Sequence, residues 1–179
     1  DSVIMYKILV YNEGDYDTNN IVVTDYIPDE LVFCDIKGVE QKPGEFTVTH
    51  DDVTTTWTIS ESGKTASAEI SGPIKAYDGG NSLDGRSVYI TCKINPGSTD
   101  ISEKHIYNIS EITSFQGEDK KTHTDRDSQP GNITDTNYAG NTDPVGTYKE
   151  KVNGKYNLNR VYKERYEYED DDDFEDLIM

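Results

Sequence analysis

Two acidic motifs in the last third of the chain contain the residues best suited to bind a metal ion. The first motif, DRDSQPGN, includes Asp125, Asp127 and Asn132. The second motif, EDDDD, contains four consecutive aspartates: Asp170, Asp171, Asp172 and Asp173. Calcium takes about six to eight oxygen ligands, and adjacent carboxylates repel one another unless a counter-charge lies between them. The sequence therefore predicts a calcium site that bridges the two motifs, with a solvated acidic run as the alternative.

Lys7 and Asn108 form a second candidate site, for an intramolecular isopeptide bond. Each residue lies within a run of residues that predicts a strand, one early and one late in residues 1–115. Desolvation lowers the pKa of a lysine, so that its amine can attack an amide carbon while a protonated carboxylic acid polarises the carbonyl. The candidates for that acid are Glu111 and Asp25.

A different arrangement of the first strand would keep Lys7 away from Asn108. In this arrangement Lys7 lies on the outer face of the sandwich, with Tyr6, Ile8 and Val10 facing inward. Asn108 is then a hydrogen-bonded polar residue of the core. We favour this second arrangement, because no single acid stands out in the sequence as the partner.

The two cysteines, Cys34 and Cys92, have two interpretations. They are either buried free thiols, which we favour, or a disulfide between two sheets of an exported protein. The chain contains no Cys-X-X-Cys pattern, so the sequence does not predict a zinc site.

The overall charge argues against several kinds of partner. The 179 residues contain 35 acidic and 17 basic residues, which give a formal net charge of −18. Polyanions repel such a chain, so we expect neither nucleic acid nor an anionic membrane as a partner. No apolar run approaches the roughly 18 residues that a membrane helix requires, so we expect no membrane insertion. We also expect no enzymatic activity, because no serine, cysteine or histidine lies in a recognisable catalytic motif.

Apolar residues concentrate in residues 1–115, which hold 29 of the 37 leucines, isoleucines, valines and phenylalanines. Short β-branched and aromatic runs separated by turn residues predict strands rather than helices. Residues 86–94 alternate with period two, which predicts a strand with one buried and one solvated face. The pattern predicts an all-β fold, an immunoglobulin-like antiparallel β-sandwich. We expect seven strands in this part, at residues 3–11, 21–27, 31–36, 54–59, 66–70, 86–94 and 105–115.

Residues 116–179 have a different composition and form the second predicted region. They are rich in polar and turn residues, so they cannot build a hydrophobic core alone. We predict a long, irregular, acidic C-terminal extension, packed on the sandwich or linking from it, which ends in one more strand after Asp173. Because the chain opens at Asp1 without a methionine, we expect a processed chain or a fragment of a longer one.

Several motifs together resemble the conserved-repeat domains of Gram-positive, clostridial-type cell-surface proteins. The matching segments, in chain order, are YKILVYNEGD at 6–15, VTDYIP at 23–28 with Leu31 and Phe33, Trp57, LDGR at 83–86, YNISEI at 107–112, DRDSQPGN at 125–132 and EDDDD at 169–173. The resemblance implies an extracellular domain at the cell surface or cell wall, used as a repeated stalk or assembly module. Stalk domains of related kinds join a first-strand lysine to a last-strand asparagine, which is the pairing of Lys7 with Asn108 considered above.

The sequence thus predicts a non-enzymatic structural module, rigidified by calcium. The expected partners are neighbouring copies or domains of the same surface protein, joined in one version by addition of the terminal strand to a neighbouring sheet, as in a fibre. The alternative is an adhesive domain, an adhesin that binds glycan or host protein through the tyrosine-rich insert at residues 138–168.

Overall fold

A computed structural model describes residues 2–12, 14–79, 83–98 and 105–123. Further along the chain it describes only backbone, at residues 151–152, 155–156, 162–163, 166–167 and 172–178. Every regular element in these ranges is a β-strand. The strands are β1 (Val3–Tyr11), β2 (Asn19–Tyr26), β3 (Leu31–Phe33), β4 (Gly44–His50), β5 (Val53–Ile59), β6 (Thr65–Ile70), β7 (Gly85–Ile94), β8 (His105–Gln116), β9 (Thr122–His123), β10 (Lys151–Val152), β11 (Lys155–Tyr156), β12 (Tyr162–Lys163), β13 (Tyr166–Glu167) and β14 (Asp172–Ile178).

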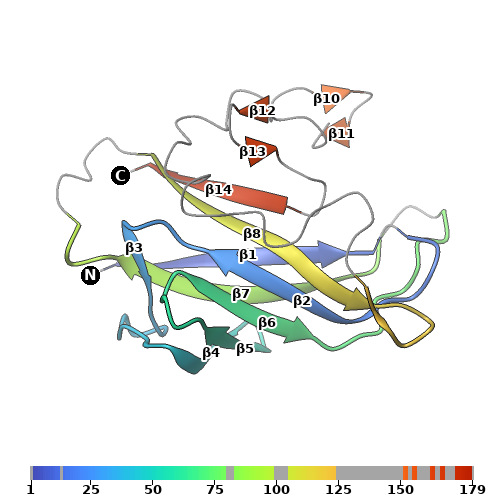
Figure 1. The fold of residues 1–179 in the computed structure, drawn as a ribbon, viewed down its shortest axis with the longest axis horizontal. Helices are drawn as coiled ribbons and strands as arrows, with labels where there is room; N and C mark the ends of the chain where they lie inside the picture. Colours follow the sequence, from blue (N-terminus) through green and yellow to red (C-terminus); the bar gives the residue numbers. More distant parts are fainter. Residues whose placement is uncertain are drawn as a thin grey trace.

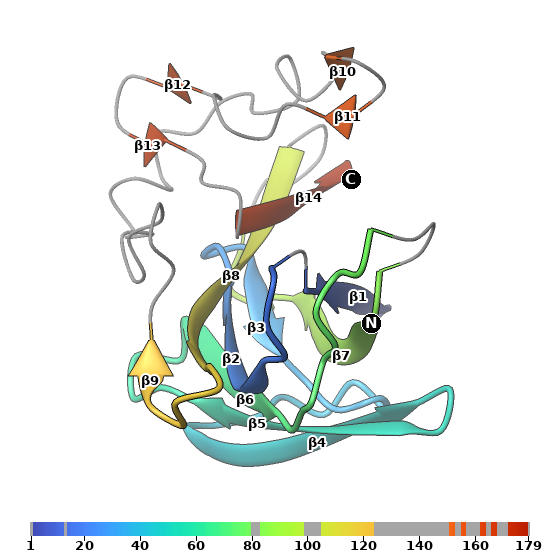
Figure 2. The same ribbon diagram turned by 90° about the vertical axis from the view of Figure 1, so that its right-hand side faces the viewer.

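Two antiparallel sheets pack together and form the predicted immunoglobulin-like β-sandwich (Figure 1). The smaller sheet has the strand order β1-β7-β3. The larger sheet has the order β14-β8-β2-β6-β5-β4, and β9 also pairs with β8. A view turned by 90° shows the edge strands β4 and β14 on opposite sides of the larger sheet (Figure 2). Separate two-stranded pairs, β10 with β11 and β12 with β13, lie between β9 and β14 in the sequence.

The hydrophobic core lies between the two sheets and explains the alternation in most strands. In β5 every second residue from Thr55 to Ile59 is buried, while the threonines between them are exposed. Large side chains that are almost completely buried in this core are Trp57, Phe33, Leu31, Ile74, Ile90 and Ile106. β-Branched and aromatic residues fit this half-buried pleated surface, which is why the sequence forms strands here.

The structure corrects the sequence prediction at three places. β4 was not predicted, because only Phe46 and Val48 are apolar in it. The third strand ends at Phe33 instead of residue 36, since the side chain of Asp35 accepts hydrogen bonds from the backbone N–H groups of Lys37 and Val39 and turns the chain. The third correction concerns β7.

β7 is buried on both faces, whereas the sequence predicted one solvated face. Tyr89, Thr91 and Lys93 are all buried. The tip of the β4–β5 hairpin covers Tyr89, whose hydroxyl donates a hydrogen bond of 2.9 Å to Asp51. Lys93 donates to the backbone carbonyl of Gly38 at 2.9 Å. Residues 37–51, in which the sequence indicated little structure, therefore supply the cover of this face.

The two ends of the sandwich carry different segments of the chain. β1 begins and β14 ends at the same end, on the left in Figure 1. The opposite end carries the connection from β1 to β2 and the segment that precedes β7. Within the described residues, no helix is long and apolar enough to cross a membrane.

Candidate functional site

A carboxyl group and a carboxamide meet between the two sheets. Asp25 on β2 is completely buried, and Asn108 on the neighbouring strand β8 is 4% exposed. The side-chain nitrogen of Asn108 donates a hydrogen bond of 2.7 Å to Oδ2 of Asp25. Buried polar residues of this kind are uncommon, and they mark either a functional site or a structural lock.

The alternation of the two strands brings this pair to the inner face. Ile21, Val23 and Asp25 are buried on the same side of β2. Asp25 is the register partner of Ser110, so Asn108 lies diagonally across from it, at the next position on the same face of β8. The β-sheet register, rather than any local motif, therefore joins the two side chains.

The surroundings of Asp25 favour its neutral form. Burial raises the pKa of Asp25 to about 7, and the hydrogen bond from Asn108 opposes this shift only in part. A buried carboxylate loses its hydration, and a single amide donor does not replace it. At neutral pH this group can therefore exist in either protonation state.

Two oxygens of the pair have no hydrogen-bond partner in the part of the chain that the structure describes. Oδ1 of Asp25 and Oδ1 of Asn108 are both buried, and neither makes a hydrogen bond among the described residues. An ionised carboxylate and an amide carbonyl can only accept hydrogen bonds. Such orphan acceptors are rare in folded proteins and require an explanation.

Lys7 does not reach this pair. Its side chain is exposed on the outer face of β1, and Nζ lies 5.9 Å from the ring centroid of Tyr89. Tyr6 and Val10 are buried on the other face, and Ile8 packs against the core, as in the arrangement that the sequence favoured. Lys93 is the one buried lysine of the described residues, and it points to Gly38 instead. The structure thus joins Asn108 to an acid but not to an amine.

The second acid that the sequence suggested, Glu111, faces the other side of β8. It is 1% exposed and accepts a hydrogen bond of 2.7 Å from the hydroxyl of Tyr26. Asp25 and Glu111 are thus buried on opposite faces of the larger sheet. Asp25 is the one that contacts Asn108.

Both cysteines are buried free thiols. Cys34 is held beside β7, since its backbone N–H donates to the carbonyl of Thr91 at 3.0 Å. Burial raises the pKa of Cys34 to about 11. Burial also raises the pKa of Cys92 well above its ordinary value, and the negative charge of Asp25 adds to this shift. The thiol of Cys92 is therefore part of the surroundings of Asp25.

The predicted calcium ligands lie largely outside the described residues. Asp125, Asp127, Asn132, Asp170 and Asp171 are outside them, as is most of the tyrosine-rich insert. Asp172 and Asp173 begin β14, where their backbone pairs with Glu111 and Ser110 of β8. Within the described part of the chain, no group of three or more histidine, cysteine or acidic side chains is arranged to hold a metal ion.

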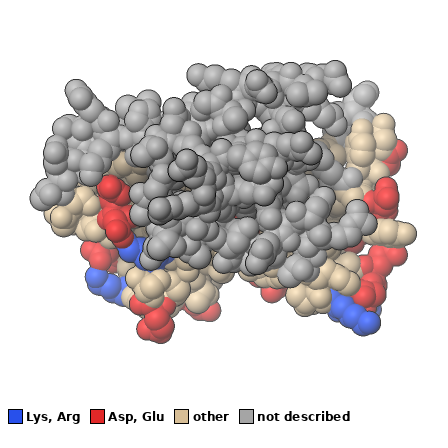
Figure 3. Space-filling model, turned by 45° about the horizontal axis from the view of Figure 1, so that its top comes forward, with Lys and Arg blue, Asp and Glu red and all other residues tan. Residues whose placement is uncertain are grey.

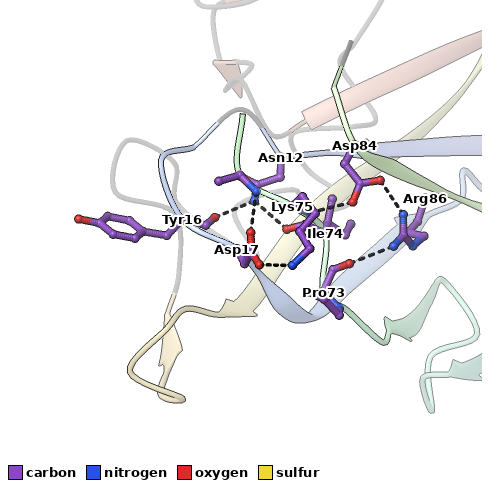
Figure 4. A network of polar contacts seen from close by, with 9 residues as sticks. Asn12, Tyr16, Asp17, Pro73, Ile74, Lys75, Asp84 and Arg86 are labelled. Carbon is purple, nitrogen blue, oxygen red and sulfur yellow. Dashed lines mark hydrogen bonds and ion pairs between the residues drawn. The ribbon is translucent and has the colours of Figure 1, made fainter. Parts of the chain in front are cut away.

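A polar network that the sequence did not predict closes the end of the sandwich opposite Val3 (Figure 4). Asn12 donates to the carbonyls of Tyr16 and Ile74. Asp17 pairs with Lys75, and this hydrogen bond holds the pKa of the Asp17 carboxyl below its usual range.

Asp84 extends this network to β7. Its carboxylate accepts from the backbone N–H of Lys75 at 2.8 Å and from Arg86 at 2.9 Å, and these hydrogen bonds lower its pKa. Arg86 also donates to the carbonyl of Pro73. In the sequence, the LDGR motif at 83–86 was the feature that could have indicated this network. Since these groups are hydrogen-bonded to one another, the network serves to join the loops at this end.

The charged surface is mainly acidic. In the face that Figure 3 shows, acidic side chains of the described residues gather at both ends, with a few lysines and arginines among them.

Comparisons of the chain with protein-family models, with curated proteins and with solved structures found no match.

Proposed function

We propose that this chain is a non-enzymatic structural module of a bacterial extracellular surface protein, used for spacing or assembly. One observation carries the proposal: among the described residues, the acid–amide pair, the second buried acid and the two thiols are closed to solvent. Asp25, Cys34 and Cys92 are completely buried, Glu111 is 1% exposed and Asn108 is 4% exposed. A catalytic group must reach its substrate, whereas groups enclosed in this way act on the fold itself.

The polar network at the end of the sandwich supports the same proposal. The network of Asn12, Asp17, Lys75, Asp84 and Arg86 joins loops at one end of the sandwich. Rigid loop connections suit a spacer, because they keep the domain from fraying at the end where it meets other parts of an assembly. The resemblance to conserved-repeat surface domains adds the extracellular setting.

Assembly through the edge of β8 is the second part of the proposal. β14 pairs along seven residues of β8, from Asp172 opposite Glu111 to Ile178 opposite His105. Forty-eight residues, 124–171, separate β14 from the end of β9 in the sequence. The described core residues, from Tyr6 to Ile106, belong to the part of the chain that precedes β14, and they stay in place when β14 is exchanged. A neighbouring copy would add its own β14 to this edge by the same main-chain hydrogen bonds.

Cysteine pairs test this exchange. Tyr107 and Asp176 are register partners, so cysteines at these positions can form a disulfide only when β14 lies along β8. We would mix a Tyr107→Cys chain with an Asp176→Cys chain and look for a disulfide-linked heterodimer. Mixing Tyr107→Cys with Asp173→Cys is the matched control, since that pair is three residues out of register. A disulfide that forms only within a Tyr107→Cys/Asp176→Cys double variant, on a chain that stays monomeric, would contradict exchange.

Calcium is the proposed rigidifying ion, and the two acidic motifs are its proposed ligands. A ligand that binds only the folded state stabilises it by about 2.7 kcal/mol at a hundredfold excess over Kd. We expect millimolar calcium to raise the thermal midpoint relative to EDTA and to protect residues 116–179 from limited proteolysis. Magnesium at the same concentration is the control for ionic strength. Identical melts and cleavage patterns would argue that the aspartates are only solvated charge.

A further inference from the structure

Two buried oxygens that lack a partner among the described residues belong to side chains that already contact each other. Asn108 gives its N–H to Oδ2 of Asp25, and Oδ1 of each residue is left over. When Asp25 is ionised, both leftover oxygens can only accept hydrogen bonds, so neither can satisfy the other. A single proton on Asp25 turns one of these acceptors into a donor.

We propose that Asp25 carries a proton on Oδ1 and donates it in a hydrogen bond to Oδ1 of Asn108. The two side chains then form a cyclic acid–amide pair with two hydrogen bonds, which locks β2 to β8 and opens when Asp25 loses its proton to solvent. One proton therefore satisfies both orphan oxygens, and no water or ion is needed between the sheets. This lock does not depend on the proposed assembly role, because it lies on the inner face of the sheet.

The groups around the pair give an ionised Asp25 no support. On β6 the register partner of Asp25 is Ala66, and on β8 it is Ser110. Cys92 on β7 carries no positive charge. The pKa of its thiol is itself raised by burial and by the negative charge of Asp25. Glu111 lies on the opposite face of β8, and Glu175 on β14 is the register partner of Asn108. Among the described residues, no lysine or arginine contributes to the pKa of Asp25.

The direction of the pH effect follows from this environment. In the unfolded chain the carboxyl loses its proton near its ordinary pKa of 3.8, whereas in the folded chain it holds the proton to about pH 7. The unfolding equilibrium constant should therefore rise roughly tenfold per pH unit between about pH 4 and pH 7, and then level off. The lock closes on the acidic side of neutrality and loosens above it.

Carboxyl carbon NMR on the unmodified chain is the direct test. We expect the side-chain carboxyl resonance of Asp25 to titrate with a midpoint near neutral pH. The exposed carboxyl of Asp17 should titrate in the acidic range in the same spectra. An Asp25 resonance that is already that of a carboxylate at pH 5 would overturn the proposal.

The variant Asp25→Asn tests the lock itself. An asparagine keeps one donor and one acceptor toward Asn108 at every pH, so it imitates the protonated acid. We expect the ratio of the unfolding equilibrium constant of wild type to that of Asp25→Asn to grow about tenfold per pH unit through the acidic range and to level off near neutrality. Asp17→Asn, which removes an exposed acid, should show no such rise of the ratio with pH. Parallel pH profiles for wild type and Asp25→Asn would contradict the lock.

Hydrogen exchange shows where the lock acts. Amides of β2 and β8 near the pair should exchange faster in wild type than in Asp25→Asn at pH 8, and equally at pH 5. Amides of β4 and β5 serve as the internal reference. Equal exchange of β2 and β8 in the two proteins at both pH values would contradict a local opening, even if Asp25 titrates as expected. Should Asp25→Asn fail to fold, the carboxyl titration decides the question alone.

Discussion

The indole nitrogen of Trp57 lies 2.8 Å from the backbone carbonyl oxygen of Tyr89 and donates a hydrogen bond to it. Trp57 belongs to β5 of the larger sheet and Tyr89 to β7 of the smaller one, so this bond joins the two sheets. Trp57 is completely buried. The single tryptophan thus fixes how the sheets pack, in addition to filling space between them.

Replacing Trp57 with phenylalanine should destabilise the fold by about 2–4 kcal/mol. The change leaves the carbonyl of Tyr89 without this donor and leaves a cavity where the indole was. Urea denaturation followed by circular dichroism measures the effect, because the variant lacks the tryptophan fluorescence. Thr56→Ser, at an exposed neighbouring position, should stay within about 0.5 kcal/mol of wild type. A Trp57→Phe chain of unchanged stability would show that the hydrogen bond contributes nothing.

Removing the amide of Asn108 should destabilise the protein by about 2 kcal/mol. In Asn108→Ala the buried carboxyl of Asp25 loses its hydrogen-bond donor, and a buried polar group without a partner is costly.

A second contact between the same two strands provides the control for Asn108→Ala. Gln116→Ala removes a partly buried hydrogen bond from Asn20, and water can replace that bond. Denaturation of both variants at pH 6 should therefore show a clearly larger loss for Asn108→Ala. Equal losses would mean that burial does not distinguish the two contacts.

The sequence was sufficient for strands whose apolar residues alternate in an obvious way. β1 was predicted with its observed bounds, and the strand after Asp173 was also found. β4 was missed because only two of its residues, Phe46 and Val48, are apolar, and threonines, a glutamate and a histidine surround them. A strand that covers one side of another strand is recognisable only when both are placed in space.

The acid–amide pair was only half predictable. Asn108 was recognised as a mid-strand polar residue, and Asp25 was one of two acids considered as its neighbour. The choice between Asp25 and Glu111 depends on the register of β2 against β8, since a shift of one residue moves a side chain to the other face. The outward position of Lys7, by contrast, was predictable from the alternation in β1 alone, because Tyr6 and Val10 are the buried residues around it.

Gly85 should not tolerate a side chain. A Cβ atom at this position would lie 2.7 Å from a ring carbon of Tyr11 and 2.9 Å from the backbone carbonyl oxygen of Val10. Gly85→Ala should therefore force β1 and β7 apart at their paired ends and lower the thermal midpoint. Gly97→Ala is the matched control, because its Cβ would meet nothing closer than Oδ1 of Asn95 at 3.4 Å. A Gly85→Ala chain as stable as Gly97→Ala would show that Tyr11 moves aside freely.

The two thiols should not react with thiol reagents in the folded protein. Cys34 and Cys92 are completely buried, and burial raises the pKa of both groups, so little thiolate forms at neutral pH. We expect an aromatic disulfide reagent to modify neither residue at pH 7.5 and both residues in denaturant. The rate of modification then reports opening of the sandwich. Rapid labelling of either cysteine without denaturant would contradict the enclosed core.

Lys7 and Asn108 should remain unlinked in the isolated chain. The exposed ammonium group of Lys7 lies over the ring of Tyr89, while the carboxamide of Asn108 faces Asp25 between the sheets. The two groups therefore lie apart, and the amine cannot reach the amide carbon that it would have to attack. The intact mass should equal the mass of the sequence, with no loss of ammonia, and Lys7→Ala should unfold close to the wild-type midpoint. A mass lower by one ammonia, together with a peptide pair containing residues 7 and 108, would instead require β1 to turn its outer face toward β8.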